Sequence, residues 1–98
     1  MSITASKTEN RITISISGSF DFKMRTPFRK AYISESGKLP FVVDFANVDF
    51  IDSSALGMLL MLREHCGGND SDITLINCKA EIKRLFQISQ FKDLFHLK

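Results

Sequence analysis

The stretch "FVVDFANVDFIDSSALGMLLMLREHCGG", residues 41–68, predicts the central unit of the fold. With the two residues before it, the start of this stretch reads "LPFVVDF", residues 39–45, a run of apolar residues that is typical of a central strand covered on both faces of a sheet. Residues 46–52 are mixed in character, and we expect a loop there. Residues 53–64 have a helical pattern, and the glycines of "CGG" can end a helix in the left-handed conformation. The stretch therefore predicts a strand, a loop and a helix in succession.

The residues before this stretch predict a hairpin and a helix. Residues 12–18, "ITISISG", alternate isoleucine with threonine or serine, as in a half-buried strand. Residues 3–7 form a weaker strand candidate, and the polar turn between the two favours an antiparallel hairpin. Apolar side chains then recur at helical spacing over residues 24–32, and the Ser-Gly pair at residues 36–37 ends this run. Pro27 restricts the helix start, because proline is tolerated only in a first turn.

The residues after the stretch continue the alternation of strands and helices. Residues 72–78, "DITLINC", predict a strand, and residues 79–89 predict a helix with one apolar face. We expect a turn and a short strand in residues 90–98. Such alternation is typical of an α/β fold. We predict one compact domain over residues 1–98, with a mixed sheet of about four to five strands flanked by helices.

The composition argues against several classes of function. The chain has 13 basic and 11 acidic residues, a net charge of +2, and no block of like charges, so nucleic-acid binding is not expected. The longest apolar run, residues 55–62, is far shorter than the roughly 20 residues of a membrane span, so we expect no membrane insertion. No signal sequence is evident, which favours a cytoplasmic location. Cys66 and Cys78 are interpreted as free thiols in a reducing compartment.

The sequence offers no catalytic or metal-binding pattern. No lysine follows the glycines of "CGGND", as a phosphate-binding loop would need, and no glycines flank Ser53 as in a nucleophile elbow. His65 lies at the far end of the same predicted helix, roughly 18 Å from Ser53 at 1.5 Å per residue. The histidines and cysteines show neither CxxC nor HxxxH spacing. We expect a protein that is not an enzyme and that uses no cofactor or metal.

Three polar residues, Asp52, Ser53 and Ser54, stand where the loop becomes the helix. One interpretation is structural, because aspartate and serine accept hydrogen bonds from the free N–H groups of a first turn, so that Asp52 or Ser53 caps the helix. The other is functional, because the same N–H groups and the positive end of the helix dipole tolerate phosphate. Phosphorylation would add about −1.5 to −2 charges, nearly cancelling the net charge of the chain.

The helix after this junction carries more apolar residues than one packing face needs. Ser54, Met58, Met61 and His65 fall on one side of it, at steps of three and four residues. The methionines belong either to the core or to a surface that meets a partner. If they are exposed, a phosphate at the head of this side would disfavour an apolar interface.

Three stretches in chain order resemble the STAS domain family, the anti-sigma factor antagonists of bacteria. They are "GSFD" at residues 18–21, "VVDFANVDFIDSSALGML" at residues 42–59 and "IKRLFQIS" at residues 82–89. In the family pattern, a strand ends in an apolar-Asp/Asn-apolar step, a loop leads to Asp-Ser-Ser/Thr, and Gly-Leu-Gly or Ala-Leu-Gly opens a helix. The central stretch matches this pattern step by step.

The resemblance implies a mixed sheet flanked by helices and a binding function without catalysis. In the family, the serine directly after the aspartate is phosphorylated by a partner serine kinase, often itself an anti-sigma factor, and a PP2C-like phosphatase removes the phosphate. That serine is Ser53. The unphosphorylated form binds its partner through the surface around this loop and the next helix, and we expect a monomer when free. The residues implied in partner binding are Asp21, Asp52, Ser54, Met58 and Met61.

Two departures and one alternative accompany the resemblance. Ala55 replaces a common family glycine and favours helix formation, and Ser19 replaces an acidic residue that takes part in the family pattern. The alternative function is a STAS subunit of a transport or lipid-trafficking complex that is not phosphorylated. The Asp-Ser pair favours the phosphorylated binding module.

Overall fold

The chain begins with an antiparallel hairpin in the computed structural model, which describes residues 2–98. The hairpin consists of β1 (Ser2–Lys7) and β2 (Ile12–Phe20). Along the first part of β2 the isoleucines are buried, whereas the threonine and serine between them are half-buried. The Thr8 hydroxyl accepts hydrogen bonds from the backbone N–H groups of Asn10 and Arg11 in the turn. The predicted hairpin is therefore confirmed.

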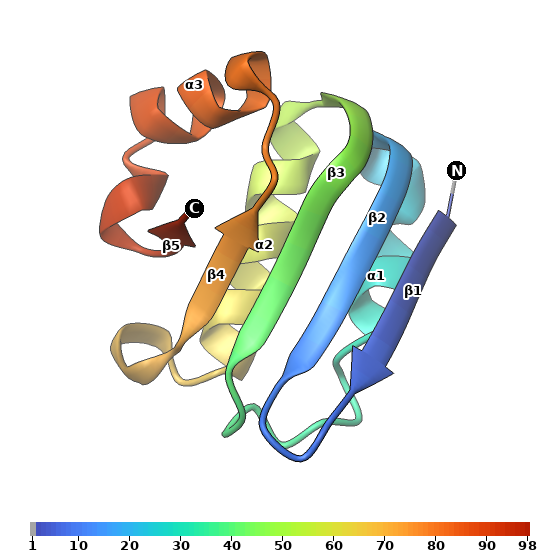
Figure 1. The fold of residues 1–98 in the computed structure, drawn as a ribbon, viewed down its shortest axis with the longest axis vertical. Helices are drawn as coiled ribbons and strands as arrows, with labels where there is room; N and C mark the ends of the chain where they lie inside the picture. The colour runs from blue at the N-terminus through green and yellow to red at the C-terminus, as the bar shows by residue number, and fades with distance from the viewer. Residues whose placement is uncertain (1) are drawn as a thin grey trace.

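Three further strands extend the sheet from β2. They are β3 (Phe41–Ile51), β4 (Ile73–Ile76) and β5 (His96–Leu97). The order is β1-β2-β3-β4-β5, and every pair after the hairpin is parallel. This confirms the predicted mixed sheet and the short strand at the end of the chain. Figure 1 shows the strands side by side, with α1 and α2 behind them.

Within residues 2–98, three α-helices and three short 3-10 turns connect the strands. They are η1 (Phe22–Met24), α1 (Arg25–Lys30), α2 (Ser53–His65), η2 (Gly68–Asp70), α3 (Ala80–Ile88) and η3 (Phe91–Asp93). Pro27 lies in the first turn of α1, as predicted. Gly67, with φ +102°, ends α2 in the left-handed conformation, as predicted for this segment.

Helix α1 is shorter than the apolar repeat predicted. It ends at Lys30, whereas the sequence pattern placed the end at residues 36–37. After Lys30 the backbone tightens: Tyr32 N–H donates to the carbonyl of Arg29, three residues back, at 3.2 Å. Tyr32 is nevertheless buried, because the turn keeps its ring against the core. The apolar repeat thus identified buried residues correctly but overestimated the length of the helix.

Strand β3 includes residues 46–51, which the sequence analysis assigned to a loop. The prediction was wrong because two bulges break the period-two pattern. Opposite β2, one extra β3 residue lies between the pairs Ser15↔Asp44 and Ser17↔Asn47, and a second bulge follows Gly18. The buried residues of β3 change from every second to every third position, ending with Phe45, Val48 and Ile51. The bulges therefore keep this strand on the core while it extends to the start of α2.

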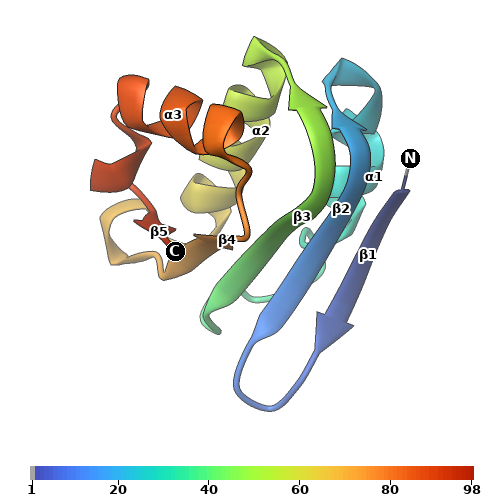
Figure 2. The same cartoon turned by 45° about the horizontal axis from the view of Figure 1, so that its top comes forward.

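Only one face of β3 is fully covered, which corrects the prediction of a strand buried on both faces. Phe41, Val43 and Phe45 point toward the helices and are fully buried, whereas Val42 and Asp44 are half-buried on the opposite face. Figures 1 and 2 show α1 and α2 together on one side of the sheet. The alternation of buried and half-buried residues along β3 cannot be recognised in the sequence, because Val42 is apolar and yet does not face the core.

A row of aromatic rings joins the helices to the sheet. Phe20 contacts Phe28 of α1 with ring centroids 5.1 Å apart, and it contacts Phe45 of β3 at 6.0 Å. Phe45 in turn contacts Phe86 of α3 at 5.5 Å, and Phe86 stacks on Phe91 at 5.5 Å. The aromatic row anchors α3 and the end of the chain to the same core.

Among the described residues, no helix is both long and apolar enough to cross a membrane.

Candidate functional site

The ends of β2 and β3 bring two separate polar segments together. The two strands are parallel, so both carboxyl ends lie at one edge of the sheet, where Phe20 pairs with Ile51. The N–H of Asp52 donates to the carbonyl of Phe20 at 3.4 Å. Asp21 directly follows β2 and Asp52 directly follows β3. The topology thus places the "GSFD" loop beside the junction that opens α2.

Asp52 caps helix α2. Its backbone is extended, with φ −112° and ψ −180°, and its Oδ1 accepts a hydrogen bond from the backbone N–H of Ala55 at 3.2 Å. The same oxygen accepts a hydrogen bond from Ser54 Oγ at 2.5 Å. The capping interpretation holds for Asp52, while Ser53 lies inside the helix as its first residue. Asp52 therefore holds the first turn of α2 in place.

The hydrogen bonds at this cap favour the ionised form of the carboxyl group. The bond from the Ser54 hydroxyl is the main reason that the pKa of Asp52 lies below its ordinary value. Backbone N–H groups of Ala55 and Phe22 add to this lowering of the pKa, while partial desolvation opposes it. The hydrogen bonds of the cap therefore favour the negatively charged form of Asp52.

The two serines have different environments. Ser54 is half-buried, and its hydroxyl is engaged by Asp52. Ser53 is exposed, and its side chain makes no hydrogen bond within residues 2–98. The side chain of Ala55 behind them is fully buried, so the methyl group that replaces the common family glycine contributes to the core. The structure therefore leaves the Ser53 hydroxyl free for chemistry and assigns the Ser54 hydroxyl to the cap.

Asp21 has a structural role at the same edge of the sheet. It precedes η1, and its Oδ1 accepts a hydrogen bond from the backbone N–H of Lys23 at 3.0 Å. Its side chain is half-buried, so it remains accessible at the edge. Asp21 thus fixes the direction of the loop that carries Phe22 into solvent.

Two exposed phenylalanines at this edge were missed by the sequence analysis. Phe22 and Phe50 are 63% and 57% exposed, although both are large apolar side chains. Phe22 follows β2, and Phe50 lies at the second bulge of β3, next to Ile51. In the sequence, each of these phenylalanines directly follows an aspartate, in "FDF" and in "DFID", and this polar neighbour is the signal that could have indicated exposure. Exposed apolar side chains mark a contact surface when they gather into one patch.

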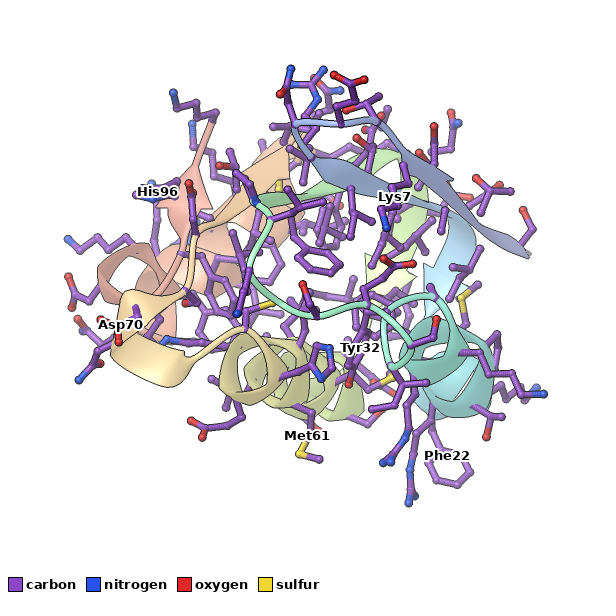
Figure 3. All side chains as sticks on the ribbon, turned by 90° about the horizontal axis from the view of Figure 1, so that it is seen from below. Lys7, Phe22, Tyr32, Met61, Asp70 and His96 are labelled. Atoms are coloured by element: carbon purple, nitrogen blue, oxygen red, sulfur yellow. The ribbon has the colours of Figure 1, made fainter. Side chains whose placement is uncertain are left out.

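The two methionines of α2 do not share one environment. Met58 is 7% exposed and belongs to the core, whereas Met61 is 56% exposed. His65, farther along, is held in place: its Nε2 lies 2.7 Å from the carbonyl oxygen of Glu35, and its ring packs on Tyr32. Figure 3 shows Phe22 and Met61 projecting on the side of the molecule that faces away from the sheet. Of the predicted side Ser54-Met58-Met61-His65, Met61 is the residue that is both apolar and exposed.

The thiol groups lie apart from this site and are poor nucleophiles. Both cysteines are free, and burial raises the pKa of Cys66 and of Cys78 to about 11. Within residues 2–98 no three histidine, cysteine or acidic side chains are grouped closely enough to hold a metal ion. The chemistry of the edge therefore rests on hydroxyl and carboxylate groups.

Comparison with known proteins identifies the family. The STAS domain model matches residues 2–98. The chain belongs to the STAS domain family. A STAS-domain containing protein of Pseudomonas aeruginosa (strain UCBPP-PA14) is 45% identical to this STAS domain over 101 residues and aligns over 99% of each chain. An anti-sigma-B factor antagonist of Staphylococcus aureus is 31% identical over 72 residues, which cover 74% of this chain and 62% of the Staphylococcus protein.

Solved structures share the fold of this STAS domain. The unphosphorylated form of the anti-sigma factor antagonist SpoIIAA superposes with a TM-score of 0.75 at 19% identity, over 99% of this chain and 87% of SpoIIAA. An anti-sigma factor antagonist from Mycobacterium paratuberculosis superposes with a TM-score of 0.82 at 18% identity, over 98% and 83% of the two chains. The family resemblance and the predicted fold class are thereby confirmed.

Proposed function

We propose that this STAS domain is an anti-sigma factor antagonist whose partner binding is controlled by phosphorylation of Ser53. The unphosphorylated chain binds an anti-sigma factor or serine kinase in the cytoplasm. Phosphorylation of Ser53 weakens that binding, and a PP2C-like phosphatase restores it. The domain catalyses no reaction of its own. Its similarity to the anti-sigma-B factor antagonist of Staphylococcus aureus supports the antagonist role.

The observation that carries this proposal is the contrast between Ser53 and Ser54. The Ser53 hydroxyl is exposed at the first position of α2, where a kinase can reach it. The Ser54 hydroxyl is committed to the Asp52 carboxylate at 2.5 Å. Phosphorylation of Ser54 would break that hydrogen bond and bring a second anion against Asp52. The geometry therefore favours Ser53 as the phosphate acceptor.

The start of α2 has features that favour a phosphate at Ser53, which is exposed there. The first turn of α2 presents backbone N–H groups and the positive end of the helix dipole, both of which favour an anion. The phosphate would add about −1.5 to −2 charges to a chain whose net charge is +2. The modification therefore changes the charge of the surface while the helix persists.

The surface around Ser53 has the character of a contact site. Phe22 and Phe50 expose large apolar rings at the same edge of the sheet, and Met61 is exposed farther along α2. Asp21 and Asp52 supply acidic groups that a basic partner side chain could contact. A phosphate in an apolar contact surface costs binding energy, because it must be desolvated when the partner docks. Met58 contributes by holding α2 on the core.

The test is to measure binding of Ser53 variants to the purified partner kinase or anti-sigma factor of the same organism. We expect Ser53→Ala to bind as the unphosphorylated chain does. Ser53→Asp should bind at least about tenfold more weakly, or ~1.4 kcal/mol. Incubation with the kinase and ATP, followed by mass spectrometry, should place the phosphate on Ser53.

Ser54→Ala is the matched control, because it removes a hydroxyl one residue away. This variant should still be phosphorylated at residue 53. Equal affinity of Ser53→Ala and Ser53→Asp for the partner would refute the switch. A phosphate found on Ser54 in the unaltered chain would refute the choice of residue.

A further inference from the structure

An open groove runs between α1 and α2 on the helix side of the molecule. It has a volume of about 390 Å³, within the range of about 300–1,000 Å³ of ligand-binding sites. Its floor is apolar and is formed by Phe28, Tyr32 and Met58, which are all buried. The exposed Met61 forms part of the groove wall on α2. Tyr32 and Met61, both of which line the groove, are labelled in Figure 3. The apolar surface that the groove leaves uncovered therefore comes mainly from Met61, above a floor of buried side chains.

The other wall of the groove is positively charged. Arg25 and Arg29, both from α1, line the groove, and both side chains are exposed. In the described part of the chain, neither arginine lies within 4.0 Å of a carboxylate. No aspartate or glutamate lines the groove. An occupant that brings carboxylates would therefore meet two guanidinium groups without competing ion pairs.

Gly57 supplies an independent sign that something approaches α2 closely. It lies in the interior of α2 and lines the same groove. A Cβ added there would meet no atom within 4 Å, so packing within the chain does not require glycine. Glycine in a helix interior costs ~1 kcal/mol relative to alanine. A missing side chain at this place leaves room for the backbone of an occupant to contact the helix.

We propose that this groove binds a helix of the partner protein that carries carboxylates beside an apolar stripe. The α2 wall extends from Ser54 to Met61, about 10 Å at 1.5 Å per residue, which is two turns of a helix. Apolar side chains of the occupant cover Met61 above the buried floor, and its carboxylates pair with Arg25 and Arg29. This mode, in which a helix lies in an apolar groove, recurs in peptide recognition.

The position of the groove explains how a phosphate would act on the partner, an inference that rests on the proposed function. Ser54 lines the groove, and Ser53 is its direct neighbour in the first turn of α2. A phosphate on Ser53 would carry the same sign of charge as the partner's carboxylates. It would repel them and compete for Arg25, which lines the same groove. Phosphorylation thus weakens binding by charge, with no change of fold.

The test uses two synthetic helical peptides of about 14 residues with the same leucine stripe. One carries glutamates beside the stripe, and the other carries lysines at the same positions. Each is titrated into the isotope-labelled, unphosphorylated chain, and backbone amide shifts are followed by NMR. We expect the glutamate peptide to bind at least about tenfold more tightly. The largest shifts should occur at Arg29, Gly57 and Met61.

Two variants test the walls of the groove. Arg25→Glu combined with Arg29→Glu should reverse the preference between the peptides, while Lys23→Glu combined with Lys30→Glu makes the same charge change outside the groove lining. Gly57→Leu should abolish binding, because its side chain fills the groove. All of these side chains are exposed, and a melting curve of each variant confirms folding.

Equal binding of the two peptides, shifts outside the groove, or binding unchanged by Gly57→Leu would overturn the proposal. Because the peptide titration involves neither kinase nor phosphate, its outcome is separate from that of the Ser53 test. The two tests can give different answers. If the glutamate peptide binds the groove but Ser53→Ala and Ser53→Asp bind the partner with equal affinity, the phosphorylation switch is refuted and the groove proposal stands.

Discussion

The Ser54 hydroxyl donates a hydrogen bond to the Asp52 carboxylate at 2.5 Å, across the first turn of α2. Through this bond the two residues together cap the start of α2, which directly follows β3 in the chain. It also separates the roles of the adjacent serines, because Ser53 is left without a side-chain partner in the described part of the chain. The stability of the helix start and the proposed phosphorylation therefore depend on two neighbouring serines that can be changed independently.

Asp52→Ala should destabilise the domain, because it removes the acceptor for Ala55 N–H and for the Ser54 hydroxyl. We expect a melting temperature a few degrees lower at pH 7, measured by circular dichroism. Asp52→Asn is the matched control, because asparagine keeps an oxygen that can cap the helix. An unchanged melting temperature in the alanine variant would contradict the capping role.

The same variants have a defined pH dependence. Because the pKa of Asp52 in the folded chain lies below its ordinary value of 3.8, ionisation of this group stabilises the fold above that value. This contribution is lost as the pH falls through the folded-state pKa. The difference in melting temperature between the unaltered chain and Asp52→Asn should therefore shrink between pH 7 and pH 3. A constant difference over this range would show that the charge has no part in the cap.

Gly57→Ala should stabilise the free domain. The added Cβ meets no atom within 4 Å, and alanine favours a helix interior over glycine by up to ~1 kcal/mol. For a domain of this size, that corresponds to a rise in melting temperature of about 4–8 °C. Thermal unfolding followed by circular dichroism at pH 7 measures it. A lower melting temperature would mean that the groove wall is already filled in the free protein.

Gly37→Ala should have the opposite effect. Gly37 has φ +77°, and a Cβ added there would lie 2.5 Å from the carbonyl oxygen of His65. Both the positive φ and the contact with backbone disfavour alanine, so we expect a loss of roughly 1–3 kcal/mol. Urea unfolding of this variant, alongside Gly57→Ala, gives the comparison. Equal midpoints for the two alanine variants would contradict the close approach of the loop to the end of α2.

The two thiols should react slowly in the folded protein. Burial raises the pKa of each from 9.0 to about 11, which lowers the thiolate fraction at neutral pH by about a hundredfold. Alkylation by iodoacetamide at pH 8, followed by mass spectrometry, should be far faster in urea than in buffer. Cys78→Ser isolates the reaction of Cys66. Rapid alkylation of the native chain would show that the thiol is exposed.

The sequence alone was sufficient where one physical signal acted locally. The alternation of isoleucine with polar residues in residues 12–16 reports a half-buried strand wherever that strand lies. Asp-Ser-Ser before an apolar helical run reports a helix start, because the free N–H groups of a first turn need acceptors. The resemblance of the same segment to the STAS domain family implied a function, and the match to the STAS domain model confirmed the family.

Tertiary structure decided what local signals could not. The bulges opposite β2 turn residues 46–51 into a strand, because pairing with a neighbouring strand stabilises a segment whose own pattern is irregular. Packing of the helices on one face decided that Val42 is half-exposed and that Met58 is buried while Met61 is not.

The sequence by itself thus determined the order of the elements, the capped start of α2 and the family. Only the folded chain decided which serine hydroxyl is free and which groove the two helices leave open. The physical reason is that exposure and pairing depend on neighbours distant in sequence: β2 and β3 meet at Phe20 and Ile51, and α1 brings Arg25 to the groove beside α2. No local sequence pattern predicts these contacts between distant segments.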